Sequence, residues 1–175
     1  MTTPRTPIVA GVAGGAGTSL IASLIGAVDG GRAEPGDAMD VLVCRSVSQH
    51  LSLATRIAAS APVPPVVVIS ADAPGKAPHQ VRDRARILQP NVPALLWLPW
   101  INPLRSMSDP PAGLRAACLE ETPAPWVTGA RELRDALIAA VSTALAAEAS
   151  EHAPAPHEAR NPSLEPGVPQ LRHTS

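Results

Sequence analysis

Short, continuous apolar runs alternate with segments of helical spacing over most of the chain. The runs begin at Ile8, at Asp40 in "DVLVCRS", at Val66 and at Ala94. A run that is apolar throughout is typical of a strand buried on both faces of a sheet. Such strands, alternating with helices, predict an α/β domain with an open, mostly parallel sheet of about four strands and flanking helices.

The segments between and after these runs carry helix signals. Ser48 precedes an amphipathic segment, where a serine can act as N-cap, and Pro78 stands in the first turn of another. A later segment has the apolar stripe of a long helix. Beyond the helix that follows the first run, helices are predicted at 48–60, at 78–88, near 113–121 and from Thr128 to about Glu148.

The expected core consists of aliphatic side chains, because the chain contains no Phe or Tyr. Residues 1–149 are expected to form one domain, and residues 150–175, rich in Pro, Glu and His, a disordered tail. The expected core residues are Val9, Val41, Val43, Val67, Ile69, Leu95 and Leu96 from the strands, and Leu20, Leu24, Leu51, Ile57 and Leu88 from the helices.

A stretch without charge runs from Thr6 to Val28. It is long enough to cross a bilayer, which takes about 20 residues. Its middle is interrupted by Gly11, Gly14, Gly15 and Gly17. A signal or membrane segment is therefore one interpretation, but a strand, a glycine turn and a helix explain the same residues in their order. We expect a cytoplasmic protein without an integral membrane segment.

Charge and cysteine content exclude few functions but favour a plain soluble domain. The formal net charge of −1 gives no overall attraction to nucleic acid or to anionic lipid. Cys44 and Cys118 lie far apart and form no C-x-x-C motif. We expect two buried free thiols in a reducing compartment, and neither a disulfide framework nor a zinc site.

The residues "AGGAGTS" (13–19) connect the first apolar run to the helix behind it. In open α/β sheets, ligands bind at the carboxyl ends of the strands. A glycine turn there lets backbone N–H groups approach an anion, and the helix N-terminus adds a partial positive charge. A complete P-loop also supplies a lysine for the phosphate and a Ser or Thr for Mg²⁺.

This loop resembles the deviant Walker A loop of the MinD/ParA family, which reads K-G-G-x-G-K-[ST]. Ala13 and Thr18 stand where that family has lysines, and Val12 replaces the first glycine. In the TadZ/CpaE branch the loop often reads G-G-x-G-[AST]-[ST], which is the better local match. The positions that match are Gly14, Gly15, Gly17 and, for the magnesium-binding hydroxyl, Ser19.

The resemblance extends over residues 7–105. "DVLVCRSVSQHL", "VVVISADAPG" and "ALLWLPWINPLR" look like successive strands of the family, with Pro99 matching the proline of I-P-x-D/N. Ser70, Ala71 and Asp72 stand where the family often has an asparagine that contacts adenine. Only a short Gly-rich link is expected before Asp40, so the family's switch Asp and Walker B Asp are missing. A shortened sheet would leave the first strand near an open edge, which favours a homodimer or a protein partner.

Loss of both lysines predicts weak nucleotide binding and no hydrolysis. Charge-assisted hydrogen bonds contribute about 1.5–3 kcal/mol each, and phosphoryl transfer depends on positioned positive charge. Arg45, Lys76 and Arg105 follow later strands and are expected at the same edge of the sheet as the loop. Asp72 is either the acidic metal ligand or an ordinary turn residue. Trp97 and Trp100 offer either an exposed aromatic interaction anchor near this edge or side chains of the core.

The expected function is that of a non-hydrolysing MinD/ParA-like scaffold or regulatory protein, in a bacterial secretion, pilus, conjugation or partition system. No catalytic residue and no required cofactor are expected, although ATP or ADP with Mg²⁺ is compatible with the loop. Ser19 is the expected metal ligand. The expected nucleotide-binding residues are Gly14, Gly15, Gly17, Thr18 and Ser19.

Three alternatives stay open. The first is a weakly active ATPase of the same class, with other cations replacing the lysines. The second is a dinucleotide-binding protein, although no G-x-G-x-x-G is present and no acidic residue ends the second apolar run. The third is DNA contact through Arg82 and Arg86, which lie four residues apart on one predicted helix.

Overall fold

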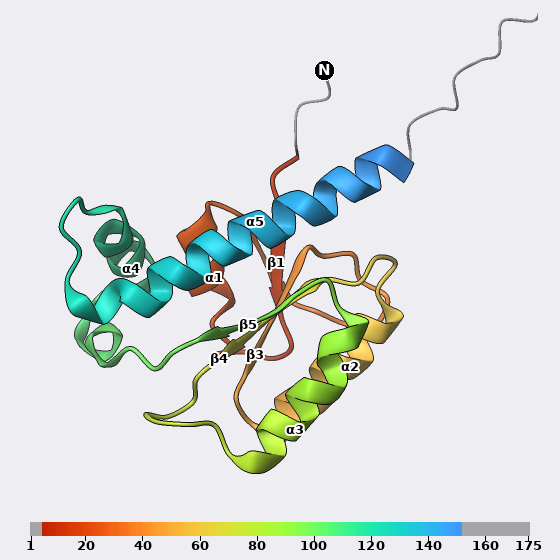
Figure 1. Cartoon of the computed structure of the whole chain (residues 1–175), viewed down its shortest axis with the longest axis horizontal. Helices are drawn as coiled ribbons and strands as arrows, with labels where there is room; N and C mark the ends of the chain where they lie inside the picture. Colours follow the sequence, from red (N-terminus) through yellow and green to blue (C-terminus); the bar gives the residue numbers. More distant parts are fainter. Residues whose placement is uncertain (1–4, 152–175) are drawn as a thin grey trace, which may run out of the picture.

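The computed structural model describes residues 5–151 (Figure 1). Most of the expected tail, from residue 152 onward, lies outside this range. The strands are β1 (Ile8–Gly11), β2 (Val28–Arg32), β3 (Val41–Arg45), β4 (Val66–Ser70) and β5 (Leu95–Leu98). The α-helices are α1 (Thr18–Ile25), α2 (Ser48–Ser60), α3 (His79–Leu88), α4 (Pro110–Leu119) and α5 (Thr128–Glu151), and the 3₁₀-helices are η1 (Gln89–Asn91), η2 (Asn102–Ser106) and η3 (Pro125–Val127).

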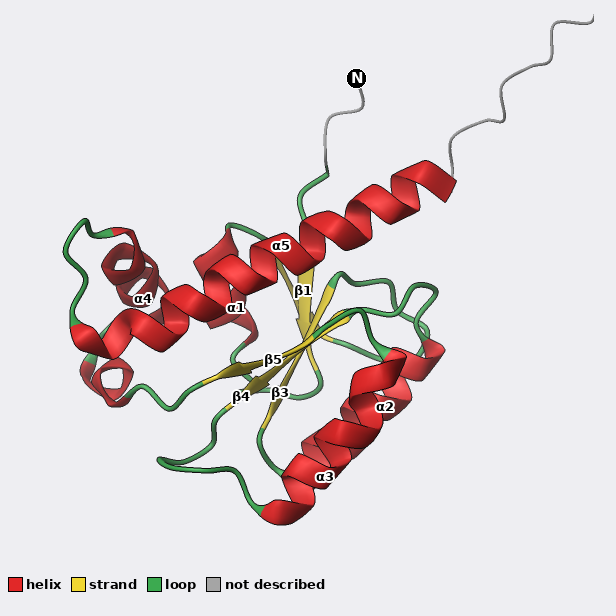
Figure 2. Cartoon of the chain, viewed as in Figure 1, coloured by secondary structure: helices red, strands yellow, loops and turns green. Residues whose placement is uncertain are grey.

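The strands form one open, fully parallel sheet in the order β2-β1-β3-β4-β5. Helices α2 and α3 cover one face of the sheet, and α1, α4 and α5 lie on the other (Figure 2). The α/β class, the parallel sheet and the long C-terminal helix predicted from the sequence are therefore confirmed. Because α5 continues through Glu151, the first residues expected in the tail, Ser150 and Glu151, are helical.

Strand β2 is the element that the sequence did not predict. Its residues, "VDGGR", were expected to be a Gly-rich link, and all of them are exposed. At Gly30 a Cβ atom would come within 2.9 Å of Ile8 Cγ2, so a glycine is needed for β2 to lie this close to β1. As a consequence β1 lies between β2 and β3, and the expectation that the first strand lies near an open edge is wrong. The open edges of the sheet belong to β2 and β5.

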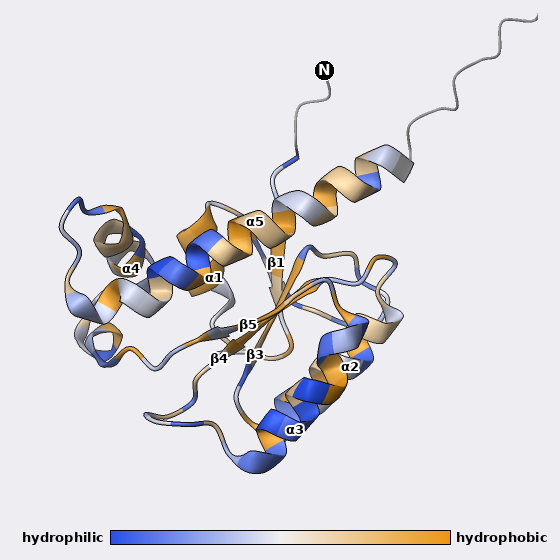
Figure 3. Cartoon of the chain, viewed as in Figure 1, coloured by the Kyte–Doolittle hydropathy of each residue, from blue (hydrophilic) through white to orange (hydrophobic). Residues whose placement is uncertain are grey.

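The central strands divide their side chains between two cores, as successive strand residues point to opposite faces. Val41 and Val43 of β3 pack with α1, α4 and α5, whereas Leu42 and Cys44 pack with α2 and α3. Figure 3 shows the apolar strands at the centre and the hydrophilic outer side of α3. Nine of the expected core residues are buried: Val9, Leu24, Val41, Val43, Leu51, Ile57, Val67, Ile69 and Leu88.

Three of the expected core residues are only partly buried: Leu20, Leu95 and Leu96. Leu95 and Leu96 belong to β5, an edge strand with a neighbour on one side alone. Leu20 lies in the first turn of α1, at the wall of a cavity. Two helix starts also differ from expectation, because Val47 rather than Ser48 is the N-cap of α2 and Pro78 precedes α3 as its N-cap.

The uncharged stretch from Thr6 to Val28 contains β1, the glycine turn and α1 rather than one long helix. Within residues 5–151, no helix is both long enough and apolar enough to cross a bilayer.

An ion-pair cluster joins both ends of the described chain at the amino end of the sheet. Nη1 and Nη2 of Arg5 donate to the two carboxylate oxygens of Asp40 at 2.7 and 2.8 Å. Asp40 Oδ2 also accepts from Ile8 N at 2.7 Å, and Arg5 reaches Glu148 of α5 at 3.2 Å. These bonds raise the pKa of Arg5 above its usual value. The cluster lies at the edge of the sheet opposite the glycine loop.

Candidate functional site

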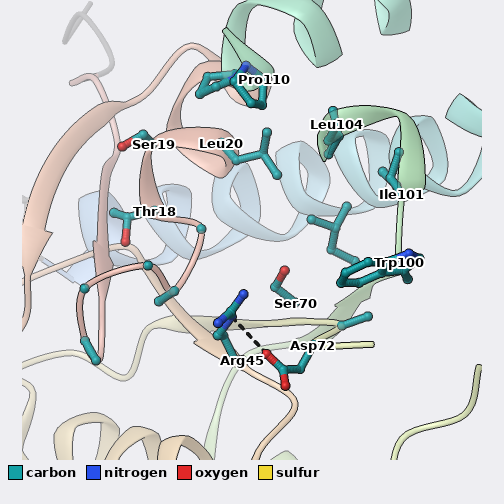
Figure 4. Close-up of a pocket in the computed structure, with 18 of the residues that line it drawn as sticks. Thr18, Ser19, Leu20, Arg45, Ser70, Asp72, Trp100, Ile101, Leu104 and Pro110 are labelled. Carbon is teal, nitrogen blue, oxygen red and sulfur yellow. Dashed lines mark ion pairs between the residues drawn. The ribbon is translucent and has the colours of Figure 1, made fainter. Parts of the chain in front are cut away.

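A cavity of about 910 Å³ lies at the carboxyl ends of the strands (Figure 4). Its walls come from the glycine loop, from the ends of β2, β3, β4 and β5, and from the segments that lead into η2 and α4. This is the edge at which open α/β sheets bind ligands. All of the site residues expected from the sequence line this one cavity: Gly14, Gly15, Gly17, Thr18 and Ser19.

The glycine loop, which lines the cavity, contains backbone amide groups without a protein acceptor in residues 5–151. Gly15 and Gly17 have positive φ angles of 72° and 100°, a conformation that glycine adopts readily. Gly17 is the N-cap of α1 and makes no side-chain capping bond. Within the described chain, the amides of Gly14, Gly15, Gly17, Thr18 and Ser19 have no protein acceptor. Such N–H groups at a helix N-terminus are suited to an anion.

Thr18 takes the place of the expected phosphate lysine but turns toward the end of β1. A Cβ atom at Gly11 would overlap Thr18 Oγ1, so the hydroxyl occupies the space that the glycine leaves free. Gly11 therefore has a packing role beside the loop. Thr18 carries no charge to replace the lysine.

Ser19 is joined to an acidic residue that the sequence analysis missed. Ser19 Oγ donates to Asp29 Oδ2 over 2.6 Å, and Asp29 Oδ1 accepts from Gly31 N at 2.9 Å. The hydroxyl and the carboxylate are both hard oxygen ligands of the kind that Mg²⁺ prefers. Within residues 5–151, no group of three or more acidic, His or Cys side chains is placed to hold a metal ion, so phosphate and water would have to complete a metal site.

Three arginines also line the cavity: Arg32, Arg45 and Arg105. Arg45 and Arg105 were expected at this edge, whereas Arg32 belongs to the unpredicted strand β2. Arg45 Nε lies 3.2 Å from Asp72 Oδ1, and Arg32 Nε lies 3.2 Å from Glu34 Oε1. Lys76, which was expected here too, lines a neighbouring cavity of about 520 Å³.

Asp72, the acidic residue singled out from the sequence, contacts Arg45 and not Ser19. Its backbone N–H donates to Ser46 Oγ at 2.8 Å, which fixes the turn after β4. Its carboxylate forms the ion pair with Arg45. Of the two acidic residues in the cavity, Asp29 is therefore the one placed to share a cation with Ser19.

The wall opposite the loop is largely apolar. Trp100 is half-buried there, and the guanidinium of Arg105 lies 5.5 Å from the centre of its ring. Trp97, on the neighbouring cavity, is more exposed. Leu20 of α1 adds an apolar side chain beside the loop, and the opposite wall is completed by Leu98, Pro99, Ile101, Leu104, Pro110 and Pro111. Such a surface suits a flat or apolar group.

His50, in the first turn of α2, contacts the end of β3. Its Nδ1 accepts a hydrogen bond from Arg45 N at 3.2 Å, which requires a neutral ring with its proton on Nε2. Burial lowers the pKa of His50, the charge of Arg45 lowers it further, and Asp72 opposes the shift.

The two cysteines belong to the cores and not to the cavity. Cys44 and Cys118 are both buried, and they pack on opposite faces of the sheet. Burial raises the pKa of Cys44 to about 12 and raises that of Cys118 as well. Neither thiol is suited to act as a nucleophile.

One of the arginines of α3, Arg86, is paired with an acidic neighbour. Arg86 lies 3.3 Å from Asp83, and Arg84 donates to Ser52 Oγ at 2.7 Å. His79 also contacts Asp83, at 2.6 Å. Asp83 thus offsets the charge of Arg86, which weakens the case for a basic DNA-binding face.

Comparison with known proteins gives no similarity: no protein-family model, no curated protein and no solved structure matches the chain. The function therefore has to be inferred from the chemistry of the cavity itself.

Proposed function

We propose that the chain is a degenerate MinD/ParA-like protein that binds a nucleotide at its glycine loop without hydrolysing it. The observation that carries the proposal is the convergence, in one cavity, of the unpaired loop amides, the Ser19–Asp29 pair and the arginine side chains. Phosphate groups need N–H donors, positive charge and usually a divalent cation. The cavity offers donors and charge directly, and oxygen ligands for the cation.

The division of the cavity into a polar and an apolar part suits a nucleotide better than inorganic phosphate. The phosphates would lie at the loop, where Gly15 and Gly17 allow close approach of the backbone. The base would lie against Trp100 and Leu104 on the opposite wall. Aromatic and apolar walls with a few polar groups are typical of cofactor sites.

Ser19 and Asp29 would hold Mg²⁺ beside the phosphates. The cation would supply positive charge that the loop does not carry. Ser19 is fixed at the start of α1, and Asp29 is oriented by Gly31 N. Their 2.6 Å contact shows that the two side chains reach a common point.

Hydrolysis is not expected, because the three arginines of the cavity are exposed and none of them is fixed at the glycine loop before an anion enters. Arg45 is paired with Asp72, Arg32 with Glu34, and Arg105 with the ring of Trp100. Phosphoryl transfer requires positive charge fixed at the transferred group and a residue that orients the attacking water. Ala13 and Thr18 offer neither. A non-hydrolysing nucleotide protein would act as a scaffold or regulator through protein contacts.

The test is calorimetric titration of the purified chain with ATP and with ADP, each with Mg²⁺. We expect binding of at least one nucleotide, abolished by Gly17→Val, because the larger residue strains a φ of 100° and fills the loop. Gly36→Val is the matched control: Gly36 has a φ of 95° but lies outside the cavity. Absence of binding, or equal loss in both variants, would contradict the proposal.

The Ser19–Asp29 pair also supports the second candidate, a weakly active ATPase of the same class, since P-loop enzymes hold Mg²⁺ with these residue types. Phosphate release under the same conditions separates the candidates. Sustained turnover that is lost in Asp29→Asn would establish the ATPase.

A protein partner, or a second copy of the chain, follows from a regulatory role and belongs to this proposal. So does a cytoplasmic location in a secretion, pilus, conjugation or partition system. Light scattering with and without ATP tests for a homodimer. A complex that forms only with ATP and not in Gly17→Val would link association to the site.

A further inference from the structure

We propose that Arg45 supplies the positive charge that the glycine loop lacks, and that Asp72 holds Arg45 until a phosphate-bearing anion enters the cavity. This rests on the proposed function, because it names the residue that binds the anion in the same site. The role is needed because Thr18 stands in the place of the phosphate lysine and its hydroxyl lies against Gly11.

The sheet brings Arg45 to the loop. Gly11 is paired with Val43, and Val12 N donates to Val43 O at 3.0 Å. Arg45, two residues further along β3, therefore lies beside the start of the glycine loop. In Figure 4 its guanidinium lies at the cavity, next to Ser70.

The other two arginines of the cavity are less suited to this role. The side chain of Arg32 is 65% exposed on the edge strand, compared with 46% for Arg45. Arg105 lies over Trp100, which places its charge at the apolar wall. Arg45 is thus the cation of the cavity that combines a central position with partial burial.

Arg45 can exchange its ion pair with Asp72 for a contact with a phosphate at little cost in free energy. Its charged atoms are 3.2 Å apart, and the Asp72 side chain is 39% exposed. An ion pair this open to water is weak, whereas a bidentate arginine–phosphate contact is strong. The exchange requires only side-chain rotation, because Ser46 Oγ and Leu98 O still hold the backbone amides of Asp72 and Ala71.

The experiment is calorimetric titration with ATP and with inorganic pyrophosphate, which contains the phosphates without the base. We expect Arg45→Gln to weaken binding of both about tenfold to a hundredfold. Arg45→Lys keeps the charge but not the planar guanidinium that contacts phosphate through two nitrogens. Its affinity should lie between those of Arg45→Gln and the native chain. Arg56→Gln, at an exposed arginine of α2 outside the cavity, is the control and should change nothing.

The holding role of Asp72 has its own readout. Asp72→Asn should tighten pyrophosphate binding about twofold to fivefold. In the NMR spectrum, the Arg45 Nε–H resonance should move on saturation with pyrophosphate and also in ligand-free Asp72→Asn. A resonance that stays unchanged on saturation would contradict the proposal that Arg45 changes its partner from Asp72 to the phosphate.

The outcomes separate this inference from the proposed function. Nucleotide binding that depends on Gly17 but survives Arg45→Gln overturns the role of Arg45 alone. Pyrophosphate binding through Arg45, without any ATP or ADP binding, supports the role of Arg45 and contradicts the proposal that the chain binds a nucleotide. If neither ligand binds, both proposals are wrong.

Discussion

Ser19 Oγ donates a 2.6 Å hydrogen bond to Asp29 Oδ2, which joins the first turn of α1 to the edge strand β2. Ser19 belongs to α1 and Asp29 to the strand that follows this helix, and they meet because β2 lies parallel to β1. Gly31 N, bonded to the other carboxylate oxygen, fixes the direction of Asp29. Since each oxygen has free lone pairs, the pair can bind a cation without rearrangement of the backbone.

Ser19→Ala and Asp29→Asn should therefore remove the effect of Mg²⁺ on nucleotide binding. Each substitution deletes one oxygen ligand, and we expect ATP affinity in the presence of Mg²⁺ to fall about tenfold or more. Without Mg²⁺, Ser19→Ala should bind ATP like the native chain, and Asp29→Asn should bind it at least as tightly, because a negative charge has been removed from the cavity. Ser142→Ala, at an exposed position of α5, is the control. A magnesium effect of native size in both variants would contradict the assignment.

Gly11→Ala should destabilise the chain, because its methyl group overlaps Thr18 Oγ1 and lies 3.3 Å from Ala16 Cβ. We expect a loss of about 1–3 kcal/mol in the free energy of unfolding, as for overpacked cores. In the Thr18→Ala background the cost should be smaller, since the overlapping hydroxyl is absent. Urea unfolding of the native chain, both single variants and the double variant measures this coupling. Gly14→Ala, where a Cβ atom meets nothing within 4 Å, should cost much less.

The sequence predicted the strands that are buried on both faces, and with them one side of the site. Continuous apolar runs at Val41–Arg45 and Val66–Ser70 have few alternatives to a central parallel strand. Because the carboxyl ends of parallel strands share an edge, the glycine loop, Arg45 and Arg105 could be placed together before their contacts were known.

The sequence did not predict β2, and so missed Asp29 and Arg32. A strand buried on neither face has no apolar pattern, and "VDGGR" reads as a turn on composition. Its pairing depends on the fit of Gly30 against Ile8, which only the folded backbone reveals. In the same way, the partner of Asp72 and the direction of Thr18 depend on side-chain positions and not on strand order.

Both cysteines should be unreactive in the folded chain. Cys44 has a pKa of about 12, and Cys118 is also buried with a raised pKa. Because the thiolate is the reactive form, a thiol reagent near neutral pH should label neither residue in the native chain and both after unfolding. Mass spectrometry after brief labelling gives the number of labelled cysteines. Fast native labelling of Cys44 would show that the α2 and α3 side of the core opens readily.

Stability should fall on mild acidification through His50. Burial and Arg45 lower the pKa of His50, so the unfolded chain binds this proton more tightly than the folded chain. The contribution of neutral His50 is therefore complete above the unfolded pKa of about 6.5, and it is lost as the pH falls through the lower folded value. Protonation of Nδ1 also removes the acceptor of Arg45 N and places a second cation beside that residue.

Urea unfolding of the native chain and of His50→Gln across this pH range isolates the effect. Carboxylates destabilise both chains at low pH, so the difference between the two chains reports His50 alone. We expect this difference to be constant above about pH 7 and to shift against the native chain as the pH falls below about 6.5. A difference that stays constant down to about pH 5 would show that folding leaves the proton affinity of His50 unchanged. Since the same proton acts next to Arg45, anion binding measured in parallel should respond over the same range of pH.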